Sequence, residues 1–403
     1  MLSDASFQAL WNNQSLISGR ERLAALDDDI LASQITISEI PAPTGEESRR
    51  AEWISRRFRS AGLADVRVDR TGNVIGRRRG ATEAPPVLIC AHLDTVFPRG
   101  TGVSVRRTGS RLTGPGIGDN GRGLAVMLAL AEVIDGVRLR TDLPIDFVAT
   151  TGEEGAGDLR GAKNVFADYS RMCGISAAIA LDGAGDERIV CRALGSRRYR
   201  ISYHGAGGHS WTAYGAPNAV HAVAVAAAKL ARLPLPSTPR TSLSVGRIGG
   251  GISINAIPDE SWLEVDLRST SARTIHEIDS QVRSVARAAE AEENGRRAHG
   301  TPPLTSNFAV IGDRPNGETP ADHPLVIAAI QATRMIGREP DLATASTDAN
   351  VPISRGIPAI AIGAGGHGGD AHTVSEWFDN SDGRRGIERA LGIVIAAAGG
   401  ARD

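Results

Sequence analysis

The stretch PPVLICAHLDTVFP, residues 85–98, joins an apolar run to a polar end. Residues 86–91 have the composition of a strand that is buried on both faces of a sheet. His92 and Asp94 follow, and because residues two apart in an extended chain point to the same side, both side chains are expected at the carboxyl end of this strand. An isolated His-x-Asp also fits a solvated turn, so this segment alone supports both interpretations.

Similar apolar segments follow this strand along the chain. Further apolar strands are predicted over residues 144–150, 177–181 and 358–362, and amphipathic helices over residues 121–135 and 384–398. Thr44 and Glu47 form a capping-box pattern for a helix that would follow them. Apolar strands that alternate with helices predict an α/β fold, in which a mixed, mostly parallel sheet is covered by helices on both faces.

A different pattern interrupts this alternation. Residues 197–204 alternate like a half-exposed strand, and the segments after them are predicted as helix 217–232, strands 241–248 and 261–268, helix 272–293 and a weak strand at 304–311. This β-α-β-β-α-β order is typical of the split βαβ motif. A chain of 403 residues usually has more than one core. We therefore predict a catalytic domain of residues 1–194 and 313–403, with an α+β domain inserted at 195–312.

Composition argues against several classes of partner. The chain has 45 basic and 46 acidic residues and a net charge of −1, which gives no electrostatic case for nucleic acid or an anionic membrane. Its three cysteines are odd in number and widely spaced, so free thiols are expected rather than disulfides. No signal-peptide pattern or long apolar run is evident. A cytoplasmic protein without nucleic-acid or membrane partners is expected.

More acidic and imidazole positions follow predicted strands or lie in glycine-rich loops. They are Asp119 in GPGIGDNGRG, Glu153 and Glu154 after FVATTG, Asp182 after IAL, and His372 in GGHGGDAHTVSEW. In open α/β sheets, ligands bind outside the carboxyl ends of the strands. Imidazole and carboxylate groups suit zinc or a similar divalent ion. Because this set exceeds what one ion needs, we predict a two-metal site with the ions about 3.5–4 Å apart.

These segments together resemble a known family. The motifs AHLDTV, GIGDNGRG, TTGEEGAG, LDG, GGHS, SINAIP, DLRS and AHTVSEW run over nearly the whole chain. They are similar to those of the dinuclear zinc hydrolases that include aminoacylase, peptidase T, carboxypeptidase G, acetylornithine deacetylase and succinyl-diaminopimelate desuccinylase. The resemblance implies a zinc-exopeptidase-like fold, with an inserted domain that forms a lid and a homodimer interface.

The resemblance also implies a set of metal ligands. His92 and Asp182 would bind one ion, Glu154 and His372 would bind the other, and Asp119 would bridge both. The expected cofactor is two Zn²⁺ per chain, with Co²⁺ or Mn²⁺ as possible substitutes.

Two acidic residues receive other roles from the resemblance. Glu153 would be the general base, which takes a proton from the metal-activated water and returns it to the leaving amine. Asp94 would accept the second N–H of His92 and orient its ring. A cis peptide is expected between Asp119 and Asn120.

Three residues of the inserted domain match substrate-binding positions of the family. His209 in GGHS would reach across the dimer interface and stabilise the oxyanion. Asn255 in SINAIP and Arg268 in DLRS would bind substrate, and Arg268 suits a bidentate grip on a carboxylate. A structural turn at His209 and a surface position for Arg268 are the alternatives.

Several positions in the C-terminal part keep more than one interpretation. His367 and His372 both lie in the glycine-rich loop, and the resemblance selects His372. Glu376 would either anchor His372 or face solvent. A loop that lines the substrate pocket is expected to contain Ser346, Thr347, Asp348 and Asn350.

The predicted function is metal-dependent hydrolysis of an amide bond in a small substrate, with a di- or tripeptide exopeptidase as the first choice. An N-acyl-amino-acid deacylase or a carbamoyl-type amidohydrolase is the alternative, since all of them would use the same residues. A non-catalytic peptide-binding protein on the same fold is the hypothesis from another class. The presence of Glu153 together with every expected ligand favours an enzyme.

Overall fold

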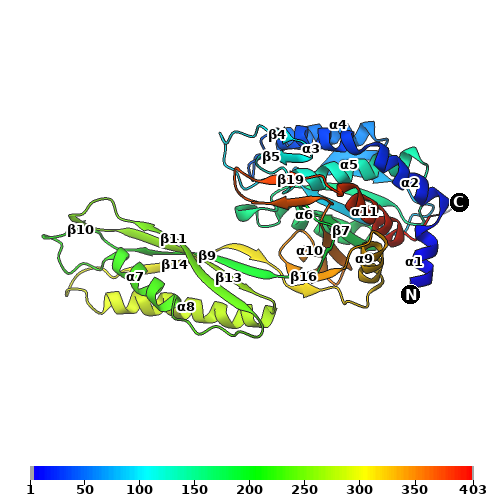
Figure 1. The fold of residues 1–403 in the computed structure, drawn as a ribbon. Coiled ribbons are helices and arrows are strands. Elements are labelled where there is room, and N and C mark those ends of the chain that lie inside the picture. Colours follow the sequence, from blue (N-terminus) through cyan, green and yellow to red (C-terminus); the bar gives the residue numbers. More distant parts are fainter. Residues whose placement is uncertain (1–3, 402–403) are drawn as a thin grey trace. The chain divides into compact units, whose positions relative to one another are not determined.

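The computed structural model describes residues 4–401. The chain divides into two compact units (Figure 1). Unit 1 combines Met1–Ala193 with Glu318–Asp403, and unit 2 is Leu194–Gly317.

A nine-stranded mixed sheet forms the centre of unit 1. Its order is β1-β2-β6-β3-β7-β17-β8-β15, and β16 pairs with β8. The strands are β1 (Ala64–Val68), β2 (Val74–Arg78), β3 (Val87–His92), β6 (Ile145–Thr150), β7 (Ala177–Leu181), β8 (Arg188–Ala193), β15 (Gly317–Glu318), β16 (Asp341–Ala345) and β17 (Ala359–Ile362). β3 runs parallel to both β6 and β7, and β17 runs parallel to β7. The predicted α/β class with a mixed sheet is confirmed.

Helices cover both faces of this sheet. They are α1 (Asp4–Trp11), α2 (Gln14–Ala25), α3 (Asp27–Ser38), α4 (Ser48–Ser60), α5 (Gly121–Gly136), α6 (Arg160–Met172), α9 (Pro324–Met335), α10 (Asn350–Ser354) and α11 (Gly383–Ala397), with a short 3₁₀ turn η1 (Gly155–Gly157). Along β3, Val87 and Ile89 belong to the core shared with α5 and α11, whereas Leu88 and Cys90 belong to the core shared with α6 and α10. Burial on both faces accounts for the continuous apolar run of this strand.

A smaller sheet lies near the C-terminal loop of unit 1. It has the order β18-β19-β5-β4, formed by β4 (Arg106–Thr108), β5 (Arg111–Thr113), β18 (His367–Gly369) and β19 (Trp377–Asp379). Because these strands are three residues long and join distant segments, no local pattern predicted them. Among the described residues, no helix is both long and apolar enough to cross a membrane.

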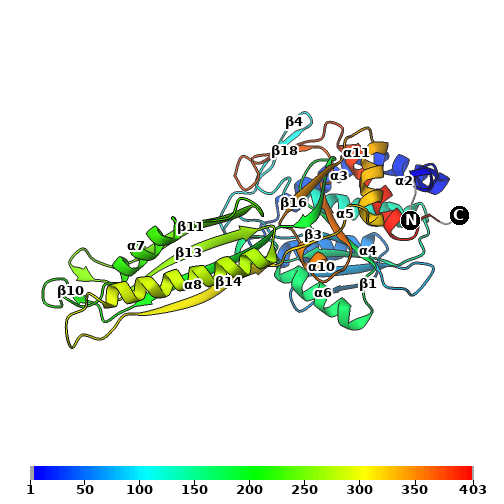
Figure 2. The same cartoon turned by 90° about the horizontal axis from the view of Figure 1, so that it is seen from below.

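Unit 2 is an antiparallel sheet with two helices on one face (Figure 2). The strands β9 (Gly195–His204), β11 (Thr241–Gly250), β13 (Glu260–Ser269) and β14 (Thr305–Arg314) have the order β11-β13-β9-β14, and β10 (Gly208–His209) pairs with β12 (Ala256–Ile257). Apolar side chains such as Tyr199 and Ile201 pack under α7 (Ala219–Leu230) and α8 (Ala272–Asn294). The intervening Arg198 and Arg200 form ion pairs with acidic residues of β13. This is the split βαβ order.

The predicted capping box before α4 is wrong. Glu47 is the N-cap residue, but its side chain caps no backbone N–H of that helix. Its carboxylate instead accepts hydrogen bonds from the N–H of Gly152 at 3.1 Å and from Arg160 at 2.7 Å. The Thr44 hydroxyl donates to Asp94 Oδ2 at 2.8 Å. The side chains of Thr44 and Glu47 thus form tertiary hydrogen bonds near the ends of β3 and β6, and neither caps α4.

Candidate metal centre

His92 lies at the end of β3 and only 3% of it is exposed. Its Nε2 is 2.9 Å from Asp119 Oδ1 and 4.0 Å from Asp182 Oδ1. Asp182 follows β7, the strand parallel to β3, so both residues leave the sheet at the same edge. One ligand atom from each of His92, Asp119 and Asp182 falls within 4.8 Å of the others, as the ligands of a single ion would.

A second group shares Asp119 with the first. His372 Nε2 is 3.1 Å from Asp119 Oδ2 and 3.0 Å from Glu154 Oε1. Asp119 therefore directs one carboxylate oxygen to each histidine. The structure brings together all five predicted ligands, and the two groups have the membership that the resemblance implied.

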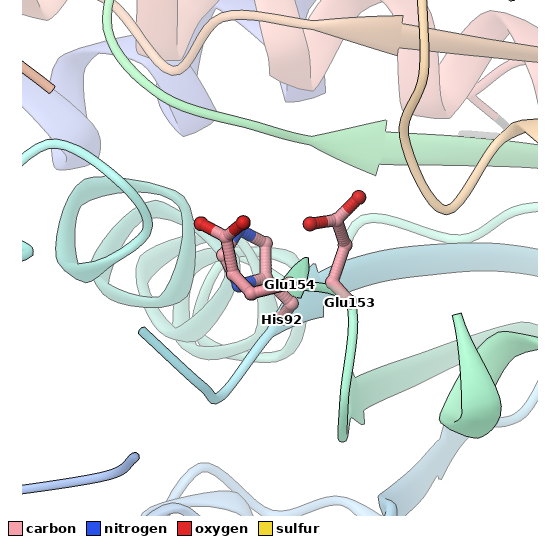
Figure 3. A group of neighbouring side chains, drawn as sticks. All are labelled: His92, Glu153 and Glu154. Carbon is pink, nitrogen blue, oxygen red and sulfur yellow. The ribbon is translucent and has the colours of Figure 1, made fainter. Parts of the chain in front are cut away.

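Glu153 and Glu154 follow β6 as adjacent residues. Figure 3 shows both carboxylates beside His92, each projecting separately from the loop. His92, Glu153 and Glu154 also place one ligand atom each within 4.8 Å. Both glutamates are buried, with exposed fractions of 5% and 6%. Adjacent residues can thus reach the same site from different directions.

Asp94 holds the backbone of both glutamates. Its Oδ1 accepts a hydrogen bond from the N–H of Glu153 at 2.9 Å, and its Oδ2 accepts one from the N–H of Glu154 at 3.0 Å. His92 Nδ1 lies 3.0 Å from the main-chain oxygen of Asp94 and 3.6 Å from its carboxylate. The backbone carbonyl is thus the nearer acceptor for the ring, and the Asp94 carboxylate, which also interacts with His92, orients the 153–154 loop.

Glu376 has neither of its two expected roles. It is buried, and its carboxylate accepts hydrogen bonds from the N–H groups of Gly116, Gly118 and Asp119 at 2.9, 2.8 and 2.8 Å. Burial raises the pKa of Glu376, while these backbone donors oppose the shift. Glu376 therefore fixes the loop that carries Asp119. The expected cis peptide between Asp119 and Asn120 is confirmed.

The electrostatics of the cluster suit cations. Burial, together with the charge of Asp119, raises the pKa of Glu154 to about 7. The hydrogen bond to Asp119 raises the pKa of His372 to about 9 despite partial burial. Among the described residues, no arginine or lysine forms an ion pair with Asp119 or Glu154. Imidazole nitrogens and carboxylate oxygens without a protein cation are a donor set that fits divalent metal ions.

The other C-terminal candidates lie elsewhere. His367 is exposed in β18, opposite Asp379, and it belongs to none of the metal-type groups found among residues 4–401. Thr347, Asp348 and Asn350 are buried and Ser346 is half-buried, so the contribution of this loop to a substrate pocket stays a prediction.

Asp348 has an environment that the sequence did not reveal. It accepts a short hydrogen bond from the Thr150 hydroxyl, and burial raises its pKa to about 6. The charges of His92, Asp94 and Asp182 also act on it, so it lies close behind the cluster. No local motif signals this contact, which joins positions 198 residues apart.

The predicted substrate residues of unit 2 form two separate groups. His209 is exposed in β10, and its Nδ1 accepts a hydrogen bond from the N–H of Trp211 at 3.1 Å. The backbone oxygen of Asn255 accepts from the N–H of Ser210, so Asn255 lies beside His209. Arg268 lies on β13, where its Nε donates to Asp266 at 2.6 Å.

Comparison with known proteins gives two family matches and many relatives. Residues 73–227 match the family described as Peptidase family M28, and residues 193–294 match the Peptidase dimerisation domain. A succinyl-diaminopimelate desuccinylase of Corynebacterium glutamicum is 28% identical over 262 residues, which cover 63% of this chain and 70% of that protein.

Solved structures show the same fold at lower identity. A tripeptidase of Staphylococcus aureus has a TM-score of 0.73 at 23% identity, covering 91% of this chain and 98% of the other. An amidase of the hydantoinase/carbamoylase family from Burkholderia vietnamiensis has a TM-score of 0.71 at 20% identity, covering 94% and 97%. Solved peptidases and other amide hydrolases thus share the fold of this chain.

Proposed function

We propose that this chain is a member of the dinuclear metallopeptidases and deacylases and that it hydrolyses an amide bond in a small peptide or N-acyl amino acid. The observation that carries the proposal is the pair of ligand groups that share Asp119. Two imidazoles, a shared acid and a further buried acid at one sheet edge are the kind of perturbed, convergent groups that mark a candidate catalytic site.

Two Zn²⁺ ions per chain fit these groups, with Co²⁺ or Mn²⁺ as substitutes. His92 and Asp182 would hold one ion, Glu154 and His372 the other, and Asp119 both. Bound divalent ions would supply Lewis-acid chemistry, which lowers the pKa of a water and polarises the amide carbonyl.

Glu153 is the group we assign to proton transfer. It is buried beside His92 and Glu154, and its N–H is held by Asp94 at 2.9 Å. Its carboxylate would accept the proton of the attacking water and then donate it to the nitrogen of the leaving amine. The hydrogen bonds of Asp94 would keep the side chains of Glu153 and Glu154 pointing in different directions. Glu153 could then transfer the proton while Glu154 binds the ion.

Substrate binding would involve unit 2 and a second copy of the chain. His209 and Asn255 lie in neighbouring loops whose large apolar side chains are exposed, namely Trp211, Tyr214, Ile252 and Ile254. Such exposed apolar side chains are typical of an interface. We assign His209 to the oxyanion in the partner's site and Arg268 to the substrate carboxylate, in a homodimer formed through the dimerisation domain.

A di- or tripeptide exopeptidase remains the first choice of activity, and a deacylase or carbamoyl-type hydrolase is the second. A panel of short peptides, N-acetyl amino acids and N-carbamoyl amino acids would distinguish them by the amino acid released. Binding of peptides by the metal-loaded protein without hydrolysis of any amide would instead support a binding protein on this fold. A cytoplasmic location also stays a prediction.

Two substitutions test the assignment of roles. Glu153→Ala should keep the metal content of the wild type and abolish turnover, because Glu153 moves protons and holds no ion. His92→Ala should lose metal as well as turnover. Elemental analysis of metal per chain, together with kcat, is the measurement. Equal metal loss in both variants would show that the roles of Glu153 and Glu154 are reversed.

Mixed dimers test the shared site. A His209→Ala protomer combined with a Glu153→Ala protomer should recover activity, since one of the two sites then has both residues intact. Absence of recovery in verified heterodimers would remove the assignment of His209 to the partner's site.

A further inference from the structure

A separate pocket of about 690 Å³ adjoins the metal centre within unit 1. Asp119 and Asp182 are part of its lining, so it opens directly onto the proposed ligands of one ion. Its volume is in the range of small-molecule sites. The proposed mechanism uses the two carboxylates and leaves the rest of the pocket without a role.

Arg188 is the cationic side chain in this lining. It is the first residue of β8 and is exposed. Its side chain forms no ion pair within the described part of the chain, although the acidic Asp341 lies opposite it in register on β16. The neighbouring Asp186 is already paired with Arg338 at 3.2 Å. Arg188 therefore keeps its donors available to a ligand.

The walls around Arg188 are held open by glycine. Gly183 and Gly185 have φ values of +72° and +105°, and a Cβ atom on either would meet nothing within 4 Å. Elsewhere in the lining, a Cβ at Gly369 would lie 2.8 Å from the ring of Trp377. That ring also stacks against Arg111, with the guanidinium carbon 4.0 Å from the ring centroid. A side chain at these glycines would narrow the space or displace the Trp377 wall.

The charged side chains of the lining are not all available to a ligand. Glu376 lines the pocket, but its carboxylate is used by three backbone N–H groups. Asp119 and Asp182 would be neutralised by the ions of the proposed function. Arg188 then supplies a positive charge that forms no ion pair within residues 4–401, and the exposed His367 adds a further hydrogen-bond donor.

We infer that this pocket is a carboxylate subsite, in which Arg188 binds an acidic group of the substrate other than the carboxylate assigned to Arg268. The inference rests on the proposed function and specifies its substrate class. The preferred substrates would carry two carboxylates, one of them beside the scissile amide. That group could belong to a dicarboxylic N-acyl chain or to the side chain of an acidic residue in a peptide, and both present the same chemistry to the guanidinium.

Matched substrate pairs that differ only by carboxylate or carboxamide provide the test. One pair is an N-succinyl amino acid and its succinamoyl analogue, and the other pairs are Asp-X with Asn-X and Glu-X with Gln-X. The metal-loaded wild type should prefer the acid in at least one pair by about tenfold or more in kcat/KM. Arg188→Ala should remove that preference, mainly through KM, and Arg188→Lys should restore part of it.

Arg192→Ala is the matched control. Arg192 is exposed on the same strand but lies outside the pocket, so its loss should leave the preference unchanged. The pair that shows the preference identifies the source of the carboxylate. Preference for the acid that survives in Arg188→Ala, or a wild type that favours the neutral member of every pair, would overturn the subsite.

Failure of the proposed function would give a different result. In that case the metal-loaded wild type would cleave none of these amides. The subsite can then be tested without turnover by titrating each acid and its amide analogue into the protein in a calorimeter. The quantity to compare is the ratio of the Kd of the amide to the Kd of the acid, measured for the wild type and for Arg188→Ala. Equal ratios in the two proteins would reject the subsite, and a ratio lost only in Arg188→Ala would support it.

Discussion

Replacing Asp94 with Asn would test whether one buried carboxylate positions both glutamates. Asp94 Oδ1 accepts from the N–H of Glu153, while Oδ2 accepts from the N–H of Glu154 and the hydroxyl of Thr44. An Asn side chain offers oxygen at only one of these positions, so its NH₂ group must face a backbone N–H. A buried N–H without an acceptor costs about 1–3 kcal/mol.

The pKa of Asp94 gives a second way to calculate how much this carboxylate stabilises the folded protein. Burial raises this pKa, but His92 and the two backbone N–H groups lower it more, to about 2 from 3.8. A difference of this size corresponds to about 2 kcal/mol of stability at neutral pH. Because both routes describe the same contacts, they are not added. We expect Asp94→Asn to lower the free energy of unfolding at pH 7 by about 2–3 kcal/mol.

The pH dependence follows from the sign of the shift. A carboxyl group whose pKa is depressed in the folded state stabilises the protein above its unfolded pKa. That stabilisation is lost as the pH falls through the folded pKa. The difference between wild type and Asp94→Asn should therefore roughly halve by about pH 3.

Chemical denaturation of the metal-free proteins at pH 7 and pH 3 measures these differences, and kcat of the loaded proteins measures the effect on Glu153. Asp259→Asn, at an exposed aspartate between β12 and β13, is the control for loss of a charge alone. Unchanged stability at pH 7, or a difference that grows as the pH falls, would refute the reasoning.

Three further outcomes are expected. Glu376→Gln should weaken metal binding by about tenfold in a metal-buffered titration, since one of the N–H groups that position Asp119 loses its acceptor; unchanged affinity would contradict this role. Tyr169→Phe should cost about 1–2 kcal/mol in denaturation without changing kcat, because its hydroxyl donates to the buried Asp146 at 2.5 Å, away from the metal centre. A chelator should lower the melting temperature by about 3 °C or more in a thermal scan, because bound ions relieve repulsion among the clustered acids; an unshifted transition would argue against bound ions.

Much of the fold was predictable because its signals are local. The apolar run of β3 and the alternation in β9 follow from the burial of their faces. Helix α6 was missed, although its apolar residues are spaced for one buried face, because the turn before it places Asp158 and Leu159 at positive φ values and provides no side-chain cap. Its start depends on that turn, which composition alone does not indicate.

At the site, too, only the features that depend on local sequence could be predicted. Spacing placed His92 and Asp182 at strand ends, and the structure brings them to one edge. The role of Glu376 could not be predicted, because its carboxylate oxygens accept hydrogen bonds from the backbone of a loop more than 250 positions earlier in the chain. The capping box at Thr44 was wrong for the same reason, since a tertiary acceptor on Asp94 takes the hydroxyl. Contacts between distant segments carry no periodicity that a local pattern could reveal.

Three independent contacts support the proposal that Asp119 is a ligand of both ions. Its two carboxylate oxygens are 2.9 Å and 3.1 Å from the imidazoles of His92 and His372. Its N–H is held by Glu376, which also fixes the loop before it. The contacts of His92 and His372 lower the pKa of Asp119 against the effect of burial, so this carboxylate is ionised. A fixed, ionised carboxylate with its oxygens directed to two imidazoles has the geometry that a ligand common to two cations requires.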